Sequence, residues 1–180
     1  MTSTLATSRL RLRPPLADDA YVVANLINNP RIAHNLVRVR SPYSLDDAHN
    51  WLNRLRTSTD PVFAITLAGK LIGVIGIEGE RHEGDLGYWL SEPYWGKGYT
   101  REAAAVILEH AFTAAGYETI VAGYRHGNEA SRRILIGLGF RHTSHAQVYS
   151  CGRKAKMLTA RLELTRREWN SGRARKGNRA

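Results

Sequence analysis

Apolar and polar residues alternate over short stretches of this chain and recur with helical spacing over longer ones. Alternation or a short apolar run between turn residues predicts strands, at residues 8–13, 62–67, 71–77, 84–90, 118–124, 140–149 and 154–163. Apolar residues three to four positions apart predict helices, over residues 22–27, 48–55, 104–115 and about 128–138. The order β-α-α-β-β-β-α-β-α-β-β predicts an α/β fold with a mixed, largely antiparallel central sheet.

Turn and cap residues set the expected boundaries of these elements. Asp18 and Asp19 can cap the first helix, and Ser44 can cap the second. Ala68-Gly69-Lys70 predicts a hairpin between two strands. Residues 28–43 contain two prolines and predict irregular structure.

Length and composition predict one globular domain. The chain has 180 residues, of which 43% are hydrophobic, enough to bury a core but too few residues for two domains. Its longest aliphatic run, residues 103–108, is far too short to cross a membrane, and the first residues do not resemble a signal peptide. We therefore expect a cytoplasmic protein. Cys151 is the single cysteine, so no internal disulfide can form and no cysteine-based metal cluster is expected.

The formal charge of +10 is concentrated at the C-terminal end. Residues 153–180 carry 10 of the 26 lysines and arginines and only two acidic residues. We expect a domain over residues 1–164 and a basic, disordered tail over residues 165–180. Such a tail can contact ribosomal RNA through its phosphates, or it can simply solvate the terminus.

One segment indicates a phosphate-binding site. An apolar strand ends in the glycine turn, which we define as residues 95–101, and this turn opens directly into a helix. Glycines let the backbone approach a ligand, and a helix N-terminus presents unpaired N–H groups and a positive dipole. The segment therefore favours binding of a pyrophosphate, although an ordinary strand-to-helix turn would have a similar sequence.

The glycine turn resembles the acetyl-CoA motif of the GNAT N-acetyltransferases, Arg/Gln-x-x-Gly-x-Gly/Ala. Trp95 and Thr100 depart from the commonest residues of this motif. The residues Trp95-Gly96-Lys97-Gly98-Tyr99, followed by Arg101-Glu102-Ala103, are similar to those of the RimJ/RimL branch, the ribosomal-protein N-terminal acetyltransferases. Asn128-Glu129-Ala130-Ser131, followed by Leu138-Gly139-Phe140, resembles the family's next helix. Residues 8–13 also read like the opening strand of the branch. The resemblance covers about residues 8–163.

This resemblance implies the GNAT fold, in which two central strands splay apart and acetyl-CoA binds between them. It implies backbone contacts to the pantetheine arm at Tyr88, Trp89 and Leu90, with the N–H group of Leu90 polarising the thioester carbonyl. It also implies cofactor contacts from a further set of residues: Trp95, Gly96, Lys97, Gly98, Tyr99, Thr100, Arg101, Asn128 and Ser131. Asn128 can equally act only as a helix N-cap.

The resemblance implies two catalytic candidates and no metal. Ser131 is the candidate acid for the departing thiolate, because Leu135 stands where many GNAT enzymes have a tyrosine; water is the alternative. Asp85 is the candidate base for the amine, or else a solvent-facing charge on its strand, and His34 is a weaker candidate. Cys151 can in principle carry an acetyl group, but direct attack in a ternary complex is expected.

The function implied is transfer of an acetyl group from acetyl-CoA to a primary amine. The acceptor is a protein N-terminus, such as that of a ribosomal protein, or a small-molecule amine. An α-amino group is easier to deprotonate near neutral pH than a lysine side chain. The alternative is a non-catalytic module that binds acetyl-CoA or ribosomal RNA. The oligomeric state and the physiological acceptor stay open.

Overall fold

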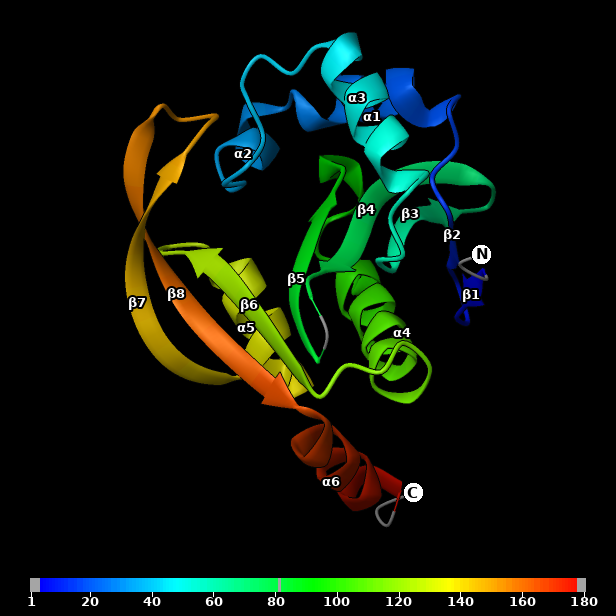
Figure 1. The fold of residues 1–180 in the computed structure, drawn as a ribbon, viewed down its shortest axis with the longest axis vertical. Coiled ribbons are helices and arrows are strands. Elements are labelled where there is room, and N and C mark those ends of the chain that lie inside the picture. Colours follow the sequence, from blue (N-terminus) through cyan, green and yellow to red (C-terminus); the bar gives the residue numbers. More distant parts are fainter. Residues whose placement is uncertain (1–3, 81, 178–180) are drawn as a thin grey trace.

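A computed structural model of the chain describes residues 4–80 and 82–177, and it contains one eight-stranded sheet with helices on both faces (Figure 1). The sheet order is β1-β2-β3-β4-β5-β6-β8-β7. The strands are β1 (Leu5–Ala6), β2 (Arg11–Arg13), β3 (Val62–Leu67), β4 (Lys70–Glu78), β5 (Glu83–Leu90), β6 (Thr119–Arg125), β7 (Arg141–Ser150) and β8 (Ala155–Thr165). The helices are α1 (Asp19–Ile27), α2 (Pro30–Ala33), α3 (Leu45–Leu55), α4 (Tyr99–Thr113), α5 (Glu129–Leu138) and α6 (Arg166–Gly177), with a 3-10 turn, η1, at Glu92–Tyr94.

Among the described strands, β5 and β6 form the one parallel pair, and α4 makes the crossover between them. Their pairing covers only the first half of β5, from Glu83 opposite Thr119 to Leu86 opposite Ala122. Beyond these residues the two strands separate. We call this region the splay: residues 87–90 of β5 and 123–125 of β6. The predicted mixed, largely antiparallel sheet with splayed central strands is thereby confirmed.

The helices bury the two faces of the sheet separately. On one face, here called the α4 side, α4 contributes six buried residues to the main core, and Leu135 of α5 joins them. The other face, the α1 side, is covered by α1 and α3 through a smaller core around Val23 and Val62. Figure 1 shows α1, α2 and α3 gathered on one side of the sheet and α4 and α5 on the other. Each face of the splay is therefore bordered by a different set of helices.

Most predicted boundaries agree with the structure, and the exceptions have local causes. Ser44 caps α3 in a reciprocal capping box with Asp47, as expected. Asp18 makes no side-chain cap; Asp19 instead accepts the N–H group of Leu16 and pairs with Arg13 at 2.7 Å. Residues 28–43 are not wholly irregular, because Asn29 and Pro30 start the one-turn helix α2.

The first predicted strand, residues 8–13, begins later than expected. Residues 7–10 form a tight turn in which Thr7 N–H donates to the Leu10 carbonyl and the Thr7 hydroxyl accepts from Leu10 N–H. A short strand, β1, precedes this turn and pairs with β2. The turn lies against the start of α4, through contacts from residues 7–9 to Glu102.

The expected disordered tail differs from the structure, which has helix α6 over Arg166–Gly177. Thr165 and Glu168 exchange hydrogen bonds in the pattern of a capping box at the start of the helix. The ring of Trp169 lies 6.2 Å from that of Phe112, and its indole donates to Glu109 at 3.0 Å. These contacts anchor the helix to the end of α4. Residues 178–180 of the predicted tail lie outside the described residues.

None of the helices in the described ranges is long and apolar enough to span a bilayer. Cys151 is exposed in the turn between β7 and β8, where the sequence placed a hairpin tip.

Candidate active site

The splay exposes backbone groups of β5. In an antiparallel pair, every second residue turns its N–H and C=O groups toward the partner strand. Ser91 donates to the Ile72 carbonyl, so this alternation turns the backbone of Ser91 and Trp89 toward β4 and that of Tyr88 and Leu90 toward β6. Pairing with β6 has already ended at Leu86. Both backbone groups of Tyr88 and the N–H group of Leu90 are therefore free to pair with an extended ligand, whereas the Leu90 carbonyl accepts the Trp95 indole and the backbone of Trp89 is committed to the sheet.

The opposite wall of the splay has the same character. His126 donates to the Leu158 carbonyl, so the alternation turns the backbone of Gly123 and Arg125 away from β8 and toward the splay. A side chain at Gly123 would lie close to Arg161, at 3.6 Å from its Nη1 atom. The Arg125 carbonyl accepts the Asn128 N–H group at 2.8 Å, so within the described chain this wall offers the Arg125 N–H group and the Gly123 carbonyl to a chain-like ligand with amide groups of its own. Gly123 and Arg125 were not identified from sequence, because only the register with β8 reveals their orientation.

The glycine turn follows β5 at one end of the splay. Gly96 and Gly98 have φ values of 73° and 80°, a left-handed conformation that other residues rarely adopt. Within the described part of the chain, the N–H groups of residues 96–101 donate to no protein acceptor. Gly98 is the N-cap of the 15-residue helix α4, whose dipole places partial positive charge at the same point. The turn therefore fits an anion such as a pyrophosphate.

Side chains of the turn hold it in place. The Trp95 indole donates to the Leu90 carbonyl at 2.6 Å, which fixes the turn to the end of β5. The guanidinium of Arg31 lies 5.1 Å from the Trp95 ring and pairs with Glu92. Arg101 donates to the Gly137 carbonyl at 3.2 Å and links α4 to α5. Trp95 and Arg101, both predicted to contact the cofactor, thus also have structural roles.

Ser131 lies on the α4 side, in the first turn of α5. Asn128 caps this helix by accepting the Ser131 N–H group at 3.2 Å, which confirms the predicted N-cap. The Tyr88 hydroxyl is buried and finds no hydrogen-bond partner among the described residues. Burial raises the pKa of Tyr88 to about 12, and the Ser131 hydroxyl, which lies nearby without reaching hydrogen-bond geometry, offsets part of that increase. Tyr88 was predicted only for its backbone, yet its side chain brings a second hydroxyl toward Ser131.

Asp85 lies on the other face of β5. It alternates with Leu86 and Tyr88, which face the α4 core, and shares the α1 side with Trp89. Its carboxylate lies 3.7 Å from Arg38 and 3.5 Å from Arg161. Asp85 stands opposite Val121, one residue before the pairing of β5 and β6 ends. Ser131 and Asp85 therefore border the splay from opposite faces of the sheet and do not form one cluster.

The segment after α2, residues 35–37, lies over the α1 side of the splay. The Cys151 N–H group donates to the Val37 carbonyl at 2.9 Å, and the Ser150 hydroxyl donates to the Leu36 carbonyl at 3.1 Å. Asn35 accepts from Arg125 at 2.9 Å. Figure 1 shows the tip of β7 and β8 reaching toward α2. The segment therefore bridges the two sides of the splay, while His34 is exposed and makes no recorded side-chain hydrogen bond within the described chain.

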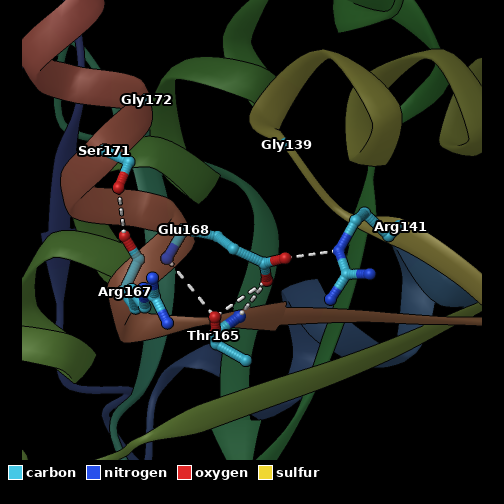
Figure 2. A pocket seen from close by; sticks show the side chains of 7 residues that line it. All are labelled: Gly139, Arg141, Thr165, Arg167, Glu168, Ser171 and Gly172. Carbon is cyan, nitrogen blue, oxygen red and sulfur yellow. Dashed lines mark hydrogen bonds and ion pairs between the residues drawn. The ribbon is translucent and has the colours of Figure 1, made fainter.

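A well-defined cavity of the described structure lies elsewhere. It has a volume of about 680 Å³ and is bordered by α6, the end of α5 and the start of β7 (Figure 2). Arg141 and Glu168 form an ion pair across it, and Thr165 donates to Glu168 at 2.8 Å. None of the candidate site residues lines this cavity. The one carboxylate in its lining, that of Glu168, is paired with Arg141, so the lining offers no free catalytic group. We therefore place the candidate active site at the splay and not at this cavity.

The described residues contain no group of three or more histidine, cysteine or acidic side chains arranged to hold a metal ion. Three histidines do approach one another at the outer strands. The His142 and His145 rings lie 4.4 Å apart, and the His126 and His145 rings 6.4 Å apart.

Comparison with known proteins agrees with this geometry. The model of the acetyltransferase (GNAT) domain matches residues 9–141. The uncharacterised N-acetyltransferase p20 of Bacillus licheniformis is 25% identical over 183 residues, covering 92% of this chain and 98% of that protein.

Two solved structures illustrate the likeness in fold. The ribosomal-protein-S5-alanine acetyltransferase of Vibrio fischeri has a TM-score of 0.78 at 23% identity, over 93% of this chain and 98% of that one. The spermidine N-acetyltransferase of Vibrio cholerae, in complex with CoA and spermine, has a TM-score of 0.78 at 20% identity, over 91% and 99%. Since the domain model matches well over half of the residues, this chain belongs to the GNAT acetyltransferases and is an acetyl-CoA-dependent N-acetyltransferase.

Proposed function

We propose that this enzyme acetylates the α-amino group of a peptide or protein N-terminus by direct attack in a ternary complex. The observation that carries the proposal is the splay, which has unpaired backbone groups on both walls and the glycine turn at one end. Asp85 lies at the other end, one residue before the pairing of β5 and β6 stops. A peptide N-terminus has a nucleophile that is largely deprotonated near neutral pH, with a pKa of about 7.7–8.0. It therefore needs only modest help from a base.

The charges on the α1 side support this acceptor over a polyamine. Arg38, Arg125 and Arg161 lie on or above this face, and the two carboxylates near them, Glu78 and Asp85, are already paired with arginine. A polycation would have to compete with these guanidinium groups. The carbonyl groups of a peptide can instead accept hydrogen bonds from them. The two structural neighbours are named for different acceptors, an alanine of ribosomal protein S5 and spermidine.

The roles proposed for the chain's own residues follow from their positions. Acetyl-CoA supplies an activated thioester. Tyr88 and Leu90 hold the pantetheine arm through their free backbone groups, and Leu90 N–H stabilises charge on the thioester oxygen. The N–H groups of residues 96–101 hold the pyrophosphate. The side chains of Trp95, Lys97, Tyr99, Thr100, Arg101 and Asn128 keep their predicted roles at the cofactor as proposals.

Two proton transfers complete the proposed reaction. The amine nitrogen forms a bond to the carbonyl carbon, and the carbon–sulfur bond breaks. Asp85 takes the amine proton directly or through one water molecule, and Ser131 or water returns a proton to the thiolate. Cys151 stands at the hairpin tip and takes no part, so Cys151→Ser should be nearly silent.

Contact with ribosomal RNA, in addition to catalysis, is the second candidate function. The basic tail favours it, but two arginines of α6 are engaged within the protein, Arg166 with Glu118 and Arg173 with Glu109. Ribosome or RNA contact through the tail stays a proposal, tested by comparing RNA binding of the full chain with that of a chain ending at residue 164.

A thiol-release assay tests the proposed acceptor. Acetyl-CoA is offered with peptides that have a free α-amine, the same peptides with a blocked α-amine and one lysine, spermidine, aminoglycosides and amino acids. We expect turnover with the free peptides and at most slow turnover with their blocked forms. Efficient turnover of spermidine with none of the peptides would contradict the acceptor. Binding of acetyl-CoA without turnover of any of these amines would place the acceptor outside the classes offered and would contradict the proposed acceptor.

A further inference from the structure

The turn at residues 7–10, nearly 90 positions from the glycine turn, makes a dense set of contacts with it. Glu102, in the first turn of α4, accepts hydrogen bonds from the Thr7 hydroxyl at 2.5 Å, the Ser8 hydroxyl at 3.3 Å and the Arg9 N–H group at 3.1 Å. Its second oxygen accepts from Arg9 Nε at 2.7 Å. One carboxylate thus fastens the N-terminal turn to the helix that begins at Gly98.

Arg9 extends this network to the glycine turn itself. Its Nη1 atom donates to the Lys97 carbonyl at 3.1 Å, and its guanidinium carbon lies 4.5 Å from the centre of the Tyr99 ring. Its Nη2 atom pairs with Glu102 at 2.6 Å and lies 3.5 Å from where a side chain on Gly98 would begin. The planar fork of arginine can make these contacts at once, whereas a lysine ammonium is a single point of charge.

The contact with the Lys97 carbonyl has a consequence for Gly98. The peptide bond between Lys97 and Gly98 is planar and trans, so its C=O and N–H groups point in opposite directions. Fixing the carbonyl on Arg9 therefore fixes the direction of Gly98 N–H, which points away from Arg9. Gly98 has φ 80° and could otherwise rotate this peptide plane easily.

We propose that Arg9 is a positioning residue for the pyrophosphate of acetyl-CoA: held by Glu102, it sets the Lys97–Gly98 peptide so that Gly98 N–H faces the ligand. The proposal rests on the placement of the cofactor at the glycine turn. Arg9 acts on the opposite side of the peptide plane from the ligand, so it influences affinity through the turn. The N-terminal segment is then a working part of the cofactor site.

The test compares affinities for CoA and 3′-dephospho-CoA, which share the pyrophosphate, by calorimetry on the full chain. Arg9→Ala should raise Kd for both ligands by the same factor, about tenfold, because the Lys97–Gly98 peptide must then be ordered at the expense of the binding free energy. Glu102→Gln should act in the same direction and more weakly. Arg11→Ala is the matched control, an exposed arginine two positions along, and it should leave both Kd values unchanged.

Two further readouts separate positioning from general damage to the fold. The Gly98 amide resonance should shift in Arg9→Ala without ligand, and KM for acetyl-CoA should rise while kcat stays within twofold. Arg9→Lys keeps the charge and most of the stem but lacks the fork, and should weaken binding about three- to tenfold. This variant decides the matter if Arg9→Ala does not fold.

Unchanged Kd values in Arg9→Ala or Arg9→Lys would overturn the proposal. A loss confined to CoA, with 3′-dephospho-CoA unaffected, would also overturn it, because the effect would then concern the 3′-phosphate. Gly98→Glu distinguishes this failure from failure of the cofactor site. Normal CoA affinity in Gly98→Glu would remove the site and the role of Arg9 together.

Discussion

At the residue scale, two hydroxyls and one carboxylate border the splay. Ser131 and Tyr88 lie on the α4 side, and Asp85 lies on the α1 side between two arginines. Sequence identified Ser131 and Asp85 but left the face of Asp85 open. Only the packing of Tyr88 against the α4 core and of Trp89 against the α1 core shows which face Asp85 occupies. The proton donor and the proton acceptor proposed for the reaction can thus work from different sides of one ligand.

Ser131→Ala should lower kcat by about 10²-fold if its hydroxyl protonates the thiolate, because general acid catalysis is typically worth about 10²–10⁴-fold and serine is a weak acid. Ser131→Thr retains the hydroxyl and should keep most of the activity. Single-turnover rates of Ser131→Ala and Ser131→Thr check this prediction; a loss of only a few-fold in Ser131→Ala would assign the proton to water.

Tyr88→Phe removes a buried hydroxyl without a partner in the described chain, so it should leave thermal stability unchanged or raise it.

Asp85→Asn should lower kcat/KM by about 10²-fold for a peptide acceptor while Kd for acetyl-CoA stays unchanged, because the base acts on the amine. Glu78→Gln is the matched control, since Glu78 stands opposite Asp85 and also pairs with Arg38. Equal losses in the two variants would show that Asp85 acts only through the arginines.

At the element scale, contacts at both ends of the glycine turn hold it in place. Trp95 ties it to β5, and the contacts of Glu102 tie it to the turn at residues 7–10. The sequence motif predicts the turn and its helix, because two glycines before a helical pattern are a local signal. It does not predict the partners of Glu102, which are more than 90 positions away and become visible only when β1 and β2 pair.

The Glu102 contacts predict a pH dependence of stability. Burial by itself would raise the pKa of Glu102, but hydrogen bonds from Thr7 and Arg9 outweigh it and lower the pKa below the usual value of 4.5. A carboxylate with a depressed pKa in the folded state contributes stability above its unfolded pKa, and loses that contribution as pH falls through the folded value.

The midpoint of thermal unfolding should therefore drop less steeply below pH 4.5 in Glu102→Gln than in the wild-type protein. At neutral pH the variant should be the less stable of the two. Parallel curves over pH 7 to 3 would contradict a stabilising role for the carboxylate.

Helix α6 shows where composition misled the prediction. Its run of basic residues is typical of a solvated tail, yet Thr165-Arg166-Arg167-Glu168 is a capping-box signature and Trp169 an apolar anchor. Both signals were present in the sequence. The packing partner of Trp169 could not be predicted, because Phe112 lies at the far end of α4.

Trp169→Ala should lower the free energy of unfolding by about 1–2 kcal/mol, since a partly buried indole and its bond to Glu109 are lost. Kd for acetyl-CoA should stay within twofold. The contact is at the C-terminal end of α4, about 20 Å along the helix from Gly98. Denaturation in urea and calorimetry check the two parts, and a large loss of cofactor affinity would show that α6 belongs to the site.

At the scale of the whole molecule, periodicity and turn residues were enough to predict the sheet and helices α1, α3, α4 and α5, but not β1, α2 or α6. The mixed sheet depends on one local fact, that α4 returns the chain in the same direction to β6 beside β5. The length over which β5 and β6 pair is a tertiary property. Leu86 and Ala122 are followed by residues that read equally well as paired strand, so the position at which the splay begins came from the structure.

The central claim is that acetyl-CoA binds with its pyrophosphate on the N–H groups of the glycine turn. Calorimetric titration of acetyl-CoA into Gly98→Glu tests it most directly, because glutamate is strained at a φ of 80° and adds a negative charge beside the N–H groups that would hold the phosphates. Gly116→Glu is the matched control, with the same charge at another glycine of positive φ, just beyond the opposite end of α4. We predict no measurable binding to Gly98→Glu and wild-type affinity in Gly116→Glu; wild-type affinity in a correctly folded Gly98→Glu protein would contradict the account.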